Sequence, residues 1–462
     1  MAVKPKIVTL TNSSVDILNA IRNNASVNYQ NYVPVATANA ESLKTIGTII
    51  MDFPALQNEF LSALVNRIGR VILSSKLYEN PWSMFKKGML EFGETVEEIF
   101  VDLAKPYQYD PAVAESKVFK REMTAVRSAF HIMNYQKFYK ATIQQEQLRQ
   151  AFLSWDGINE LISKIVDAMY TSANYDEFLT MKYMLARHIL DGRIKPHQID
   201  TSDAKSIITT VKALSNKLTF LNRDNNFAGV NTYTLKNNQY VLINSNFEAT
   251  MNVDVLASSF NMSKAEFSGH MVLVDSFGAL DVDRLDKLFA DDDTYVKPSA
   301  DELAALDSIP LVVVDKDFFM IFDNMMQFTE QYNGEGLYWN YWYHAWKIFS
   351  ISPFAQAASF VGGAPSITSV TVLPATVAVP VDFVGSIPMS VTVATSNFAS
   401  QEVVWTMTDA PDGITATVNA AGVLTVSANE NETGGVTITC TATSAVDSTK
   451  SDTCIITFGT SG

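Results

Sequence analysis

The stretch GLYWNYWYHAWKIF, from Gly336 to Phe349, decides how the fold of this chain is interpreted. Aromatic residues lie on both faces of an extended strand here, with Trp339, Tyr341 and Tyr343 on one face and Tyr338, Trp342 and Trp346 on the other. A strand with one buried face alternates apolar and polar residues, so this pattern predicts a central core strand covered from both directions. The alternative, an exposed stacking platform for bases or sugars, needs basic or hydrogen-bonding groups beside the rings. Lys347 is the only lysine or arginine here, which favours a core strand.

The segment just before the aromatic strand has the pattern of a hairpin. Leu311–Val314 and Phe318–Phe322 are apolar, and the polar residues 315–317 between them are typical of a turn. We expect these two strands and the aromatic strand to form one sheet.

Two segments show helical spacing of apolar residues. One is Leu56–Ile68, which has a single amphipathic face. The stronger pattern runs over Gly157–Leu190, and an unbroken helix there would be roughly 50 Å long at 1.5 Å per residue. Ser172 and Asn174 leave room for a bend in it.

A long hairpin is predicted near residue 90. Val71–Leu77 and Met89–Leu103 are β-like and flank a polar span. Charges of opposite sign fall on its two sides, and we treat them as candidates for contacts between subunits: Lys86, Lys87, Glu94, Glu97 and Glu98. These charges can pair within the hairpin or across to a neighbouring subunit. A solvated charged face is an equal alternative, because exposed ion pairs contribute only about 0–1 kcal/mol.

Residues 196–310 are mixed and predict an inserted α+β domain. The expected helices are Ser206–Leu221, Val253–Phe260 and Ala265–Phe267, and the expected strands are Tyr240–Ile243 and Met271–Val274.

The acidic tract Asp281–Asp293 suggests a calcium site, but no glycine stands where an EF-hand loop needs its sharp turn. A solvated loop is the better interpretation.

Beyond a linker at residues 362–365, the composition becomes rich in Val and Thr. Seven short alternating runs predict a β-sandwich: Ser369–Leu373, Met389–Ala394, Glu402–Thr408, Ile414–Val418, Val423–Ser427, Val436–Ala442 and Thr453–Phe458. Trp405 lies in the third run, where a sandwich core commonly holds a large ring. We expect Cys440 and Cys454 to be small buried hydrophobes rather than a reactive pair.

Length and charge limit the classes of function. The chain has 462 residues, enough for several domains, and a formal net charge of −15 with a pI near 4.8. Such an acidic chain is unsuited to gripping nucleic acid through its phosphates, although it can enclose DNA. No secretory signal or membrane-spanning run is recognised, and two cysteines suit a reducing cytosol.

No residue of the sequence is a candidate for catalytic or cofactor chemistry. The five histidines are dispersed, and none has the HExxH spacing of a zinc site. His344, within the aromatic strand, is expected to be a hydrogen-bonded core histidine. Phosphate-cradling loops, dinucleotide fingerprints and nucleophile elbows are absent from the sequence. We therefore expect no enzyme, no metal and no cofactor.

Short motifs in a constant order give the chain a family resemblance. They include NAIRN at 19–23, YVPVATAN at 32–39, NRIG at 66–69, FKKG at 85–88, VDKDFFM at 314–320 and GLYWNYWYHAW at 336–346. With these motifs the chain resembles the major capsid proteins of the small phi-29-like podoviruses. Its C-terminal segment resembles a bacterial immunoglobulin-like group 2 domain, through VVWTMT at 403–408 and AAGVLTVS at 420–427.

The resemblance implies an α+β fold of the Hong Kong 97 type followed by an all-β immunoglobulin-like sandwich. The implied parts are an N-terminal arm and first helix at 1–65, an extended loop hairpin at 66–112, a peripheral domain with a spine helix at 113–195, an axial domain at 196–310, a peripheral sheet at 311–362 and the immunoglobulin-like domain at 366–462. Trp339, Tyr341, Trp342, Trp346 and Trp405 are the expected structural core residues.

The same resemblance implies a structural protein that self-assembles into an icosahedral or prolate shell around phage double-stranded DNA. The implied partners are further copies of the chain in pentamers and hexamers, a scaffolding protein and a portal, with no membrane and no sequence-specific DNA binding. It places the protein in the virion capsid, assembled in the host bacterial cytoplasm. We expect the shell to be held noncovalently, because the sequence offers no identifiable pair of Lys and Asn for a covalent crosslink. The alternatives are a cell-surface adhesin and a carbohydrate-active protein with an appended sandwich.

Overall fold

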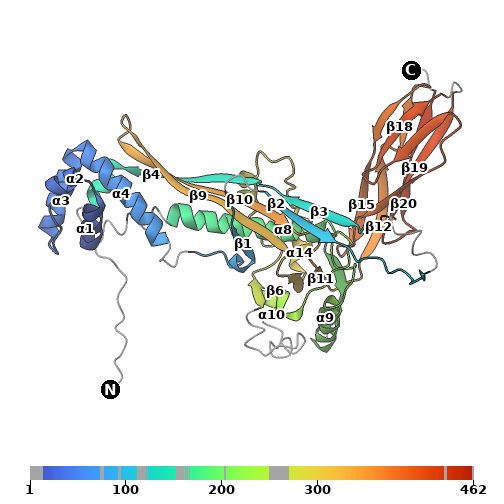
Figure 1. Ribbon diagram of the computed structural model, residues 1–462, viewed down its shortest axis with the longest axis horizontal. Coiled ribbons are helices and arrows are strands. Elements are labelled where there is room, and N and C mark those ends of the chain that lie inside the picture. The colour runs from blue at the N-terminus through green and yellow to red at the C-terminus, as the bar shows by residue number, and fades with distance from the viewer. Residues whose placement is uncertain are drawn as a thin grey trace. The chain divides into compact units, whose positions relative to one another are not determined.

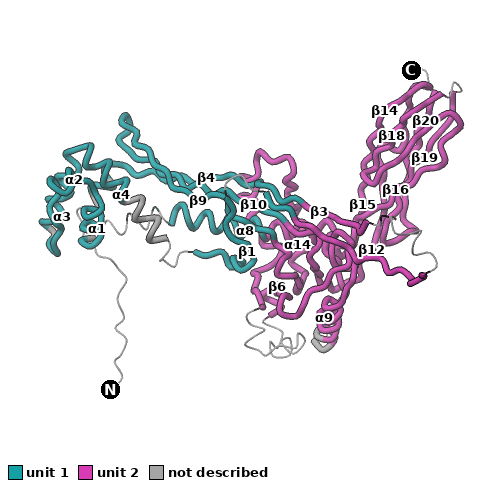
Figure 2. The backbone as a smooth tube through the Cα atoms, in the orientation of Figure 1, with its two compact units in different colours: residues 1–97, 130–181, 320–350 teal, residues 98–129, 182–319, 351–462 magenta. Residues whose placement is uncertain are grey.

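The computed structural model describes residues 14–72, 78–91, 95–111, 121, 123–151, 161, 165, 167–201, 204–248, 270–430 and 434–459. The chain divides into two compact units (Figure 2). Unit 1 comprises residues 1–97, 130–181 and 320–350, and unit 2 comprises residues 98–129, 182–319 and 351–462. Each unit is therefore assembled from three separate stretches of the chain.

Unit 1 begins with four helices: α1 Ser14–Asn24, α2 Val27–Tyr32, α3 Ala40–Asp52 and α4 Pro54–Ile72. The Ser26 side chain caps α2 by accepting a hydrogen bond from the backbone N–H of Tyr29, and Asn39 caps α3 in the same way. Pro54 occupies the first position of α4, where its missing N–H costs nothing. The predicted helix at residues 56–68 is confirmed, since it lies within α4.

A four-stranded sheet lies almost entirely within unit 1, and its strands are labelled in Figure 1. Its order is β1-β9-β10-β4, with β1 Lys86–Met89, β9 Phe319–Asn333, β10 Tyr338–Ile351 and β4 Tyr135–Gln144. The aromatic stretch forms β10, which runs antiparallel to β4 from Tyr338 opposite Gln144 to Lys347 opposite Tyr135. The prediction that it is a central strand is confirmed.

Cover from both directions is not found on β10. Trp339, Tyr341 and Tyr343 are buried, and they pack with apolar residues of α1, α3 and α4 in one core cluster. On the other face Trp342 and Trp346 are only half-buried. The expectation of two covered faces is wrong for the single chain, because the described helices of this cluster cover one face.

The long helix is shorter than its sequence pattern. Helix α8 covers Ser172–Leu190, and a single π-helical turn, η3 Asp167–Thr171, precedes it. The predicted helix is thus confirmed over residues 172–190, and its geometry changes immediately before Ser172, where a bend was expected. The predicted residues 157–160, 162–164 and 166 lie outside the described part of the chain. A separate helix, α6 Gln145–Ala151, follows β4.

Unit 2 contains a five-stranded sheet in the order β5-β11-β8-β6-β7. The strands are β5 Lys195–Gln198, β11 Ala357–Val361, β8 Leu311–Asp315, β6 Gln239–Asn244 and β7 Met271–Val274. Helix α9, Ala204–Leu218, packs Ile207, Val211 and Leu214 against the sheet. Its further helical elements are η4 Lys236–Asn238, α10 Ser245–Glu248, α13 Val282–Leu288 and α14 Ala300–Asp307. The predicted strands at 240–243 and 271–274 are confirmed, and so is the helix that begins near 206. The helices expected at 253–260 and 265–267 lie outside the described residues.

The predicted hairpin at residues 311–322 does not form. The turn is present, because the backbone N–H of Phe318 donates to the carbonyl of Asp315. However, β8 pairs with β6 and β11, whereas β9 pairs with β1 and β10. The two strands therefore belong to different sheets, since a turn signal does not decide which strands become neighbours.

The hairpin near residue 90 has different arms from those predicted. Strand β2, Val96–Val101, pairs with β3, Val126–His131, in a two-stranded sheet. Val71 and Ile72 end helix α4 instead of opening a strand, because their β propensity is weak beside the gain from continuing a helix. The 3-10 turn η1, Ser83–Phe85, leads into β1. Residues 73–77 and 92–94, which include Glu94, lie outside the described chain.

The segment after residue 365 is all β, as predicted. Its strands are β12 Ser366–Leu373, β13 Thr376–Val379, β14 Gly385–Pro388, β15 Ser390–Ser396, β16 Val403–Met407, β17 Ile414–Val418, β18 Val423–Asn429, β19 Val436–Ser444 and β20 Ser451–Phe458. They form three sheets, β12-β15, β13-β20-β19-β16 and β14-β18-β17, around one apolar core. The sequence missed β13 and β14, which are short and lie beside prolines.

Two features fix the interior of this sandwich. Cys440 and Cys454 are free, buried and opposite each other on β19 and β20, so the prediction of buried thiols is confirmed. Trp405 is half-buried against the core, and its ring contacts Gly422. A Cβ at Gly422 would lie 2.7 Å from that ring, and its φ of +76° also favours glycine. The α+β class with an all-β C-terminal part is confirmed.

Candidate functional site

Unit 1 contains four ionised side chains from four different elements. Lys86 comes from β1, Glu177 from α8, Asp323 from β9 and Lys347 from β10. The Lys86 Nζ atom lies 3.0 Å from Glu177 Oε2 and 2.7 Å from Asp323 Oδ2. Lys347 Nζ lies 2.7 Å from Asp323 Oδ1 and also pairs with Glu177. We call this group the charged cluster.

The charged cluster is closed off from solvent except at Lys86. The side chains of Glu177, Asp323 and Lys347 are buried, and that of Lys86 is partly exposed. Buried ions are tolerated only when paired and hydrogen-bonded. Here two lysines balance two carboxylates, and the Asn80 amide donates a further hydrogen bond of 2.7 Å to Glu177 Oε1.

The pKa values follow from this pairing. Burial alone would raise the pKa of the Glu177 and Asp323 carboxyls, but Lys347 and Lys86 hold both pKa values below their ordinary range. Burial alone would lower the pKa of Lys347, but the two carboxylates raise it instead. All three groups are therefore charged at neutral pH, and the cluster joins α8 to three strands of the sheet. Nothing in it is poised for acid–base or nucleophilic chemistry.

Lys86 therefore has partners within its own chain. The other proposed contact residues lie elsewhere: Lys87 is half-buried on β1, Glu97 is exposed on β2, and Glu98 accepts a 2.7 Å hydrogen bond from Ser352 Oγ. The structure does not bring Lys86 into an ion pair with Glu97 or Glu98 among the described residues. The roles of Lys87, Glu97 and Glu98 between subunits stay predictions, and Glu94 lies outside the described chain.

Sequence reasoning missed three members of the cluster. Glu177, Asp323 and Lys347 are spread over 171 residues of the chain, so no local spacing connects them. One signal was available, because Lys347 is the single lysine in a strand rich in aromatic residues. A buried strand position that carries a lysine requires a carboxylate partner.

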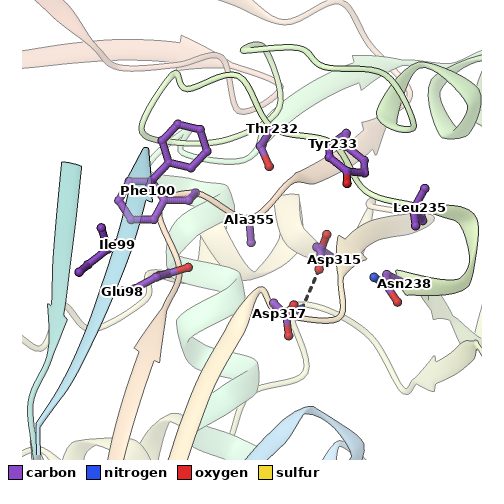
Figure 3. Close-up of a pocket in the computed structure, with 11 residues that line it drawn as sticks. Glu98, Ile99, Phe100, Thr232, Tyr233, Leu235, Asn238, Asp315, Asp317 and Ala355 are labelled. Atoms are coloured by element: carbon purple, nitrogen blue, oxygen red, sulfur yellow. Dashed lines mark hydrogen bonds between the residues drawn. The ribbon is translucent and has the colours of Figure 1, made fainter. Parts of the chain in front are cut away.

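Unit 2 has a pocket that the sequence did not indicate (Figure 3). It has a volume of about 300 Å³ and lies between β2, the loop at 232–238, the turn after β8 and residues 354–355. Figure 3 shows the carboxyl groups of Glu98, Asp317 and Asp315 along one side, opposite Phe100 and Tyr233. The residues that line it include these three carboxylates and no lysine or arginine. We call it the acidic pocket.

Neither a cluster of metal-ligating side chains nor a membrane-spanning helix is found in the described part of the chain. Within it, no group of three or more His, Cys, Asp or Glu side chains is placed to hold a metal ion. No described helix combines the length and the apolarity that a bilayer crossing requires.

His344 lies 3.3 Å from Thr329 Oγ1 and is half-buried, so its surroundings are those of a structural histidine.

Comparison with known proteins gives a consistent result. Residues 18–361 match the family described as Phi29-like phage major capsid protein. A protein named "Major capsid protein" from Bacillus phage B103 is 37% identical over 426 residues, which cover 90% of this chain and 88% of that protein. Its namesake from Bacillus phage PZA is 35% identical over 425 residues, with the same coverage.

Among solved structures, "Capsid structure of Staphylococcus phage Andhra" is similar with a TM-score of 0.49 and 14% sequence identity. The match covers 63% of this chain and 86% of that chain.

Proposed function

Since the chain belongs to the Phi29-like phage major capsid protein family, and so is a structural component of a phage virion, we propose that many copies of it assemble into an icosahedral or prolate shell around double-stranded DNA. The observation that carries this proposal is the family match over residues 18–361, which spans every strand of the four-stranded and five-stranded sheets. In a shell each copy needs only repeated weak contacts, because many such contacts act together.

The partners in this proposal are other copies in pentamers and hexamers, a scaffolding protein and a portal, with assembly in the host bacterial cytoplasm. The net charge of −15 supports a shell that encloses DNA without gripping it. No enzymatic activity is required, and the charged cluster supports this because each of its ions already has a partner of opposite charge.

The domain division is also a proposal. We place a Hong Kong 97-type arrangement in residues 1–362 and an immunoglobulin-like domain in residues 366–462. The all-β content and single apolar core of the C-terminal segment support the second assignment. The excess of acidic residues there supports a position that faces solvent.

Electron microscopy of the full chain, expressed with and without a scaffolding protein, tests the proposal. We expect closed particles of uniform size when the scaffolding protein is present. The same particles, boiled in denaturant, should run as single chains on a gel, because the contacts are noncovalent. A strictly monomeric product under both conditions would contradict assembly, whereas covalent ladders on the gel would contradict only the noncovalent contacts.

A further inference from the structure

The C-terminal sandwich follows a short linker, residues 362–365, that contains two glycines. A glycine-rich linker normally leaves a domain free to turn. Here, however, residues 397–401, which connect β15 to β16, contact both the end of helix α8 and the linker. All of these residues belong to unit 2 (Figure 2). We call residues 397–401 the clamp segment.

The side chain of Gln401 caps the C-terminal end of α8. Its Nε2 atom donates a hydrogen bond of 3.0 Å to the backbone carbonyl of Leu190, the last residue of the helix. The last four carbonyls of a helix have no partner within the helix, so this bond satisfies one of them. The donor lies 211 residues further along the chain, so only the folded protein brings the two groups together.

Gly192, two residues after α8, allows the backbone of the clamp segment to come close. Its φ of +66° favours glycine. A Cβ at this position would lie 2.6 Å from the carbonyl oxygen of Ala399 and 2.7 Å from the Cα atom of Ser400. Both neighbours are backbone atoms, so a larger residue would push the two segments apart. Ale-sized space is therefore absent at this contact, where Ala399 itself is 1% exposed.

The clamp segment begins with a strained turn. Asn397 and Phe398 have φ angles of +54° and +60°, and a bulky residue such as phenylalanine rarely adopts this conformation. Strain of this kind persists only where surrounding contacts hold it in place. Phe398 is buried, and the Asn397 amide donates a hydrogen bond of 3.0 Å to the carbonyl of Ala364 in the linker.

The two anchors of the clamp segment belong to one sheet. The end of α8 leads into β5, and the linker follows β11. These two strands pair in parallel, from Lys195 opposite Ala358 to Gln198 opposite Val361. The sandwich is thus attached to the five-stranded sheet through the linker and, separately, through the contacts at Leu190 and Gly192.

We propose that the clamp segment locks the sandwich to the end of α8, so that the sandwich and the five-stranded sheet move as one body. A domain that is held at a second point cannot pivot about its linker. In an assembled shell each copy would then present its sandwich in one orientation. The inference does not require assembly, so it is tested on the unassembled chain.

Spin labels measure whether the sandwich is fixed. Asp301→Cys and Thr417→Cys, at exposed positions on α14 and β17, carry the labels, and double electron–electron resonance gives the distribution of distances between them. The native Cys440 and Cys454 are buried and take up little label. We expect a single narrow distribution for the full chain. A broad distribution would overturn the inference.

Gly192→Ala and Gly229→Ala, each added to the labelled chain, are a matched pair. Gly229 also has a left-handed φ, of +61°, but no atom of the described chain lies within 4 Å of a Cβ built there. Its substitution therefore introduces similar backbone strain without the clash. We expect Gly192→Ala to lose the narrow distribution and Gly229→Ala to keep it. The same distribution in both variants would overturn the inference.

Gln401→Met gives a milder change, because it removes the donor to Leu190 and keeps a side chain of similar size. It should broaden the distribution less than Gly192→Ala does. Gln331→Met, at an exposed position on β9, is its control and should leave the distribution unchanged. If circular dichroism shows that Gly192→Ala does not fold, Gln401→Met decides, and a distribution equal to that of its control would overturn the inference.

Discussion

At the scale of single residues, Lys347 shows how a charge is accommodated inside unit 1. It is 4% exposed and pairs with both Glu177 and Asp323. A buried ion pair adds little net stability compared with apolar side chains of the same shape, but removing one partner leaves an uncompensated charge. The charged cluster is therefore a place where a single substitution has a large effect.

We expect Lys347→Met to lower the free energy of unfolding by about 3–5 kcal/mol, because Glu177 and Asp323 would share only Lys86. Urea unfolding of the full chain, followed by tryptophan fluorescence, measures the loss. Lys105→Met, at an exposed position, is the control and should change little. An unchanged midpoint for Lys347→Met would show that the ion pairs are not formed in solution.

The cluster also makes stability depend on pH. The pKa values of Glu177 and Asp323 are lowered from ordinary values of 4.5 and 3.8, so their contribution is present above those values and is lost as pH falls through the lowered pKa values. The pKa of Lys347 is raised from 10.5, so its contribution is lost only as pH rises through the raised value.

We therefore expect the urea midpoint to fall as the pH is lowered from about 7 to about 3. The fall should be less steep in Asp323→Asn, which lacks one of the two carboxylates. Asp409→Asn, a change at an exposed position, should keep the slope of the unsubstituted chain. A slope that Asp323→Asn leaves unaltered would contradict the assigned role of the cluster.

At the scale of elements, β10 organises unit 1 because it lies between β9 and β4 and contributes one face to the core. Trp339 is 2% exposed and contacts the ring of Tyr332, with 4.6 Å between ring centroids. Trp342, on the other face, is half-buried, with Lys140 Nζ 5.8 Å from its ring centroid. The two tryptophans therefore contribute differently to the core.

We expect Trp339→Ala to cost about 3–5 kcal/mol of unfolding free energy, as emptied aromatic core sites do. Trp342→Ala should cost clearly less unfolding free energy in the unassembled chain, because its ring is only half-buried. If both faces of β10 were covered, the two substitutions would cost the same. Paired urea titrations measure both. Equal losses would show that the second face of β10 is covered in solution.

Several elements were predictable from a local pattern. Residues 271–274 and 414–418 were assigned as strands within their observed bounds, because alternation and turn residues are properties of neighbouring positions. One group of failures concerns pairing: the strands at 311–315 and 319–333 enter different sheets, and β2 pairs with β3. Pairing depends on contacts between distant segments, which a local pattern does not contain.

At the scale of the whole molecule, the two units are not consecutive parts of the sequence. Each contains three stretches of the chain, and α8 passes from one unit into the other between residues 181 and 182. The domain boundaries that the resemblance implies, such as those at residues 195 and 310, do not coincide with the boundaries between the two units. The proposed capsid domains therefore stay a prediction, independent of how the chain divides into units.

The sequence by itself determined the α+β class, the all-β C-terminal segment, the central position of the aromatic strand and the resemblance to phage capsid proteins. These depend on residue type, periodicity and motif order, which are written along the chain. Only the tertiary structure decided that Lys86 and Lys347 share Glu177 and Asp323, and that Glu98 lines the same pocket as Asp315 and Asp317. Charge interactions act over a few ångströms in space, and residues far apart in the chain come within that range only after folding.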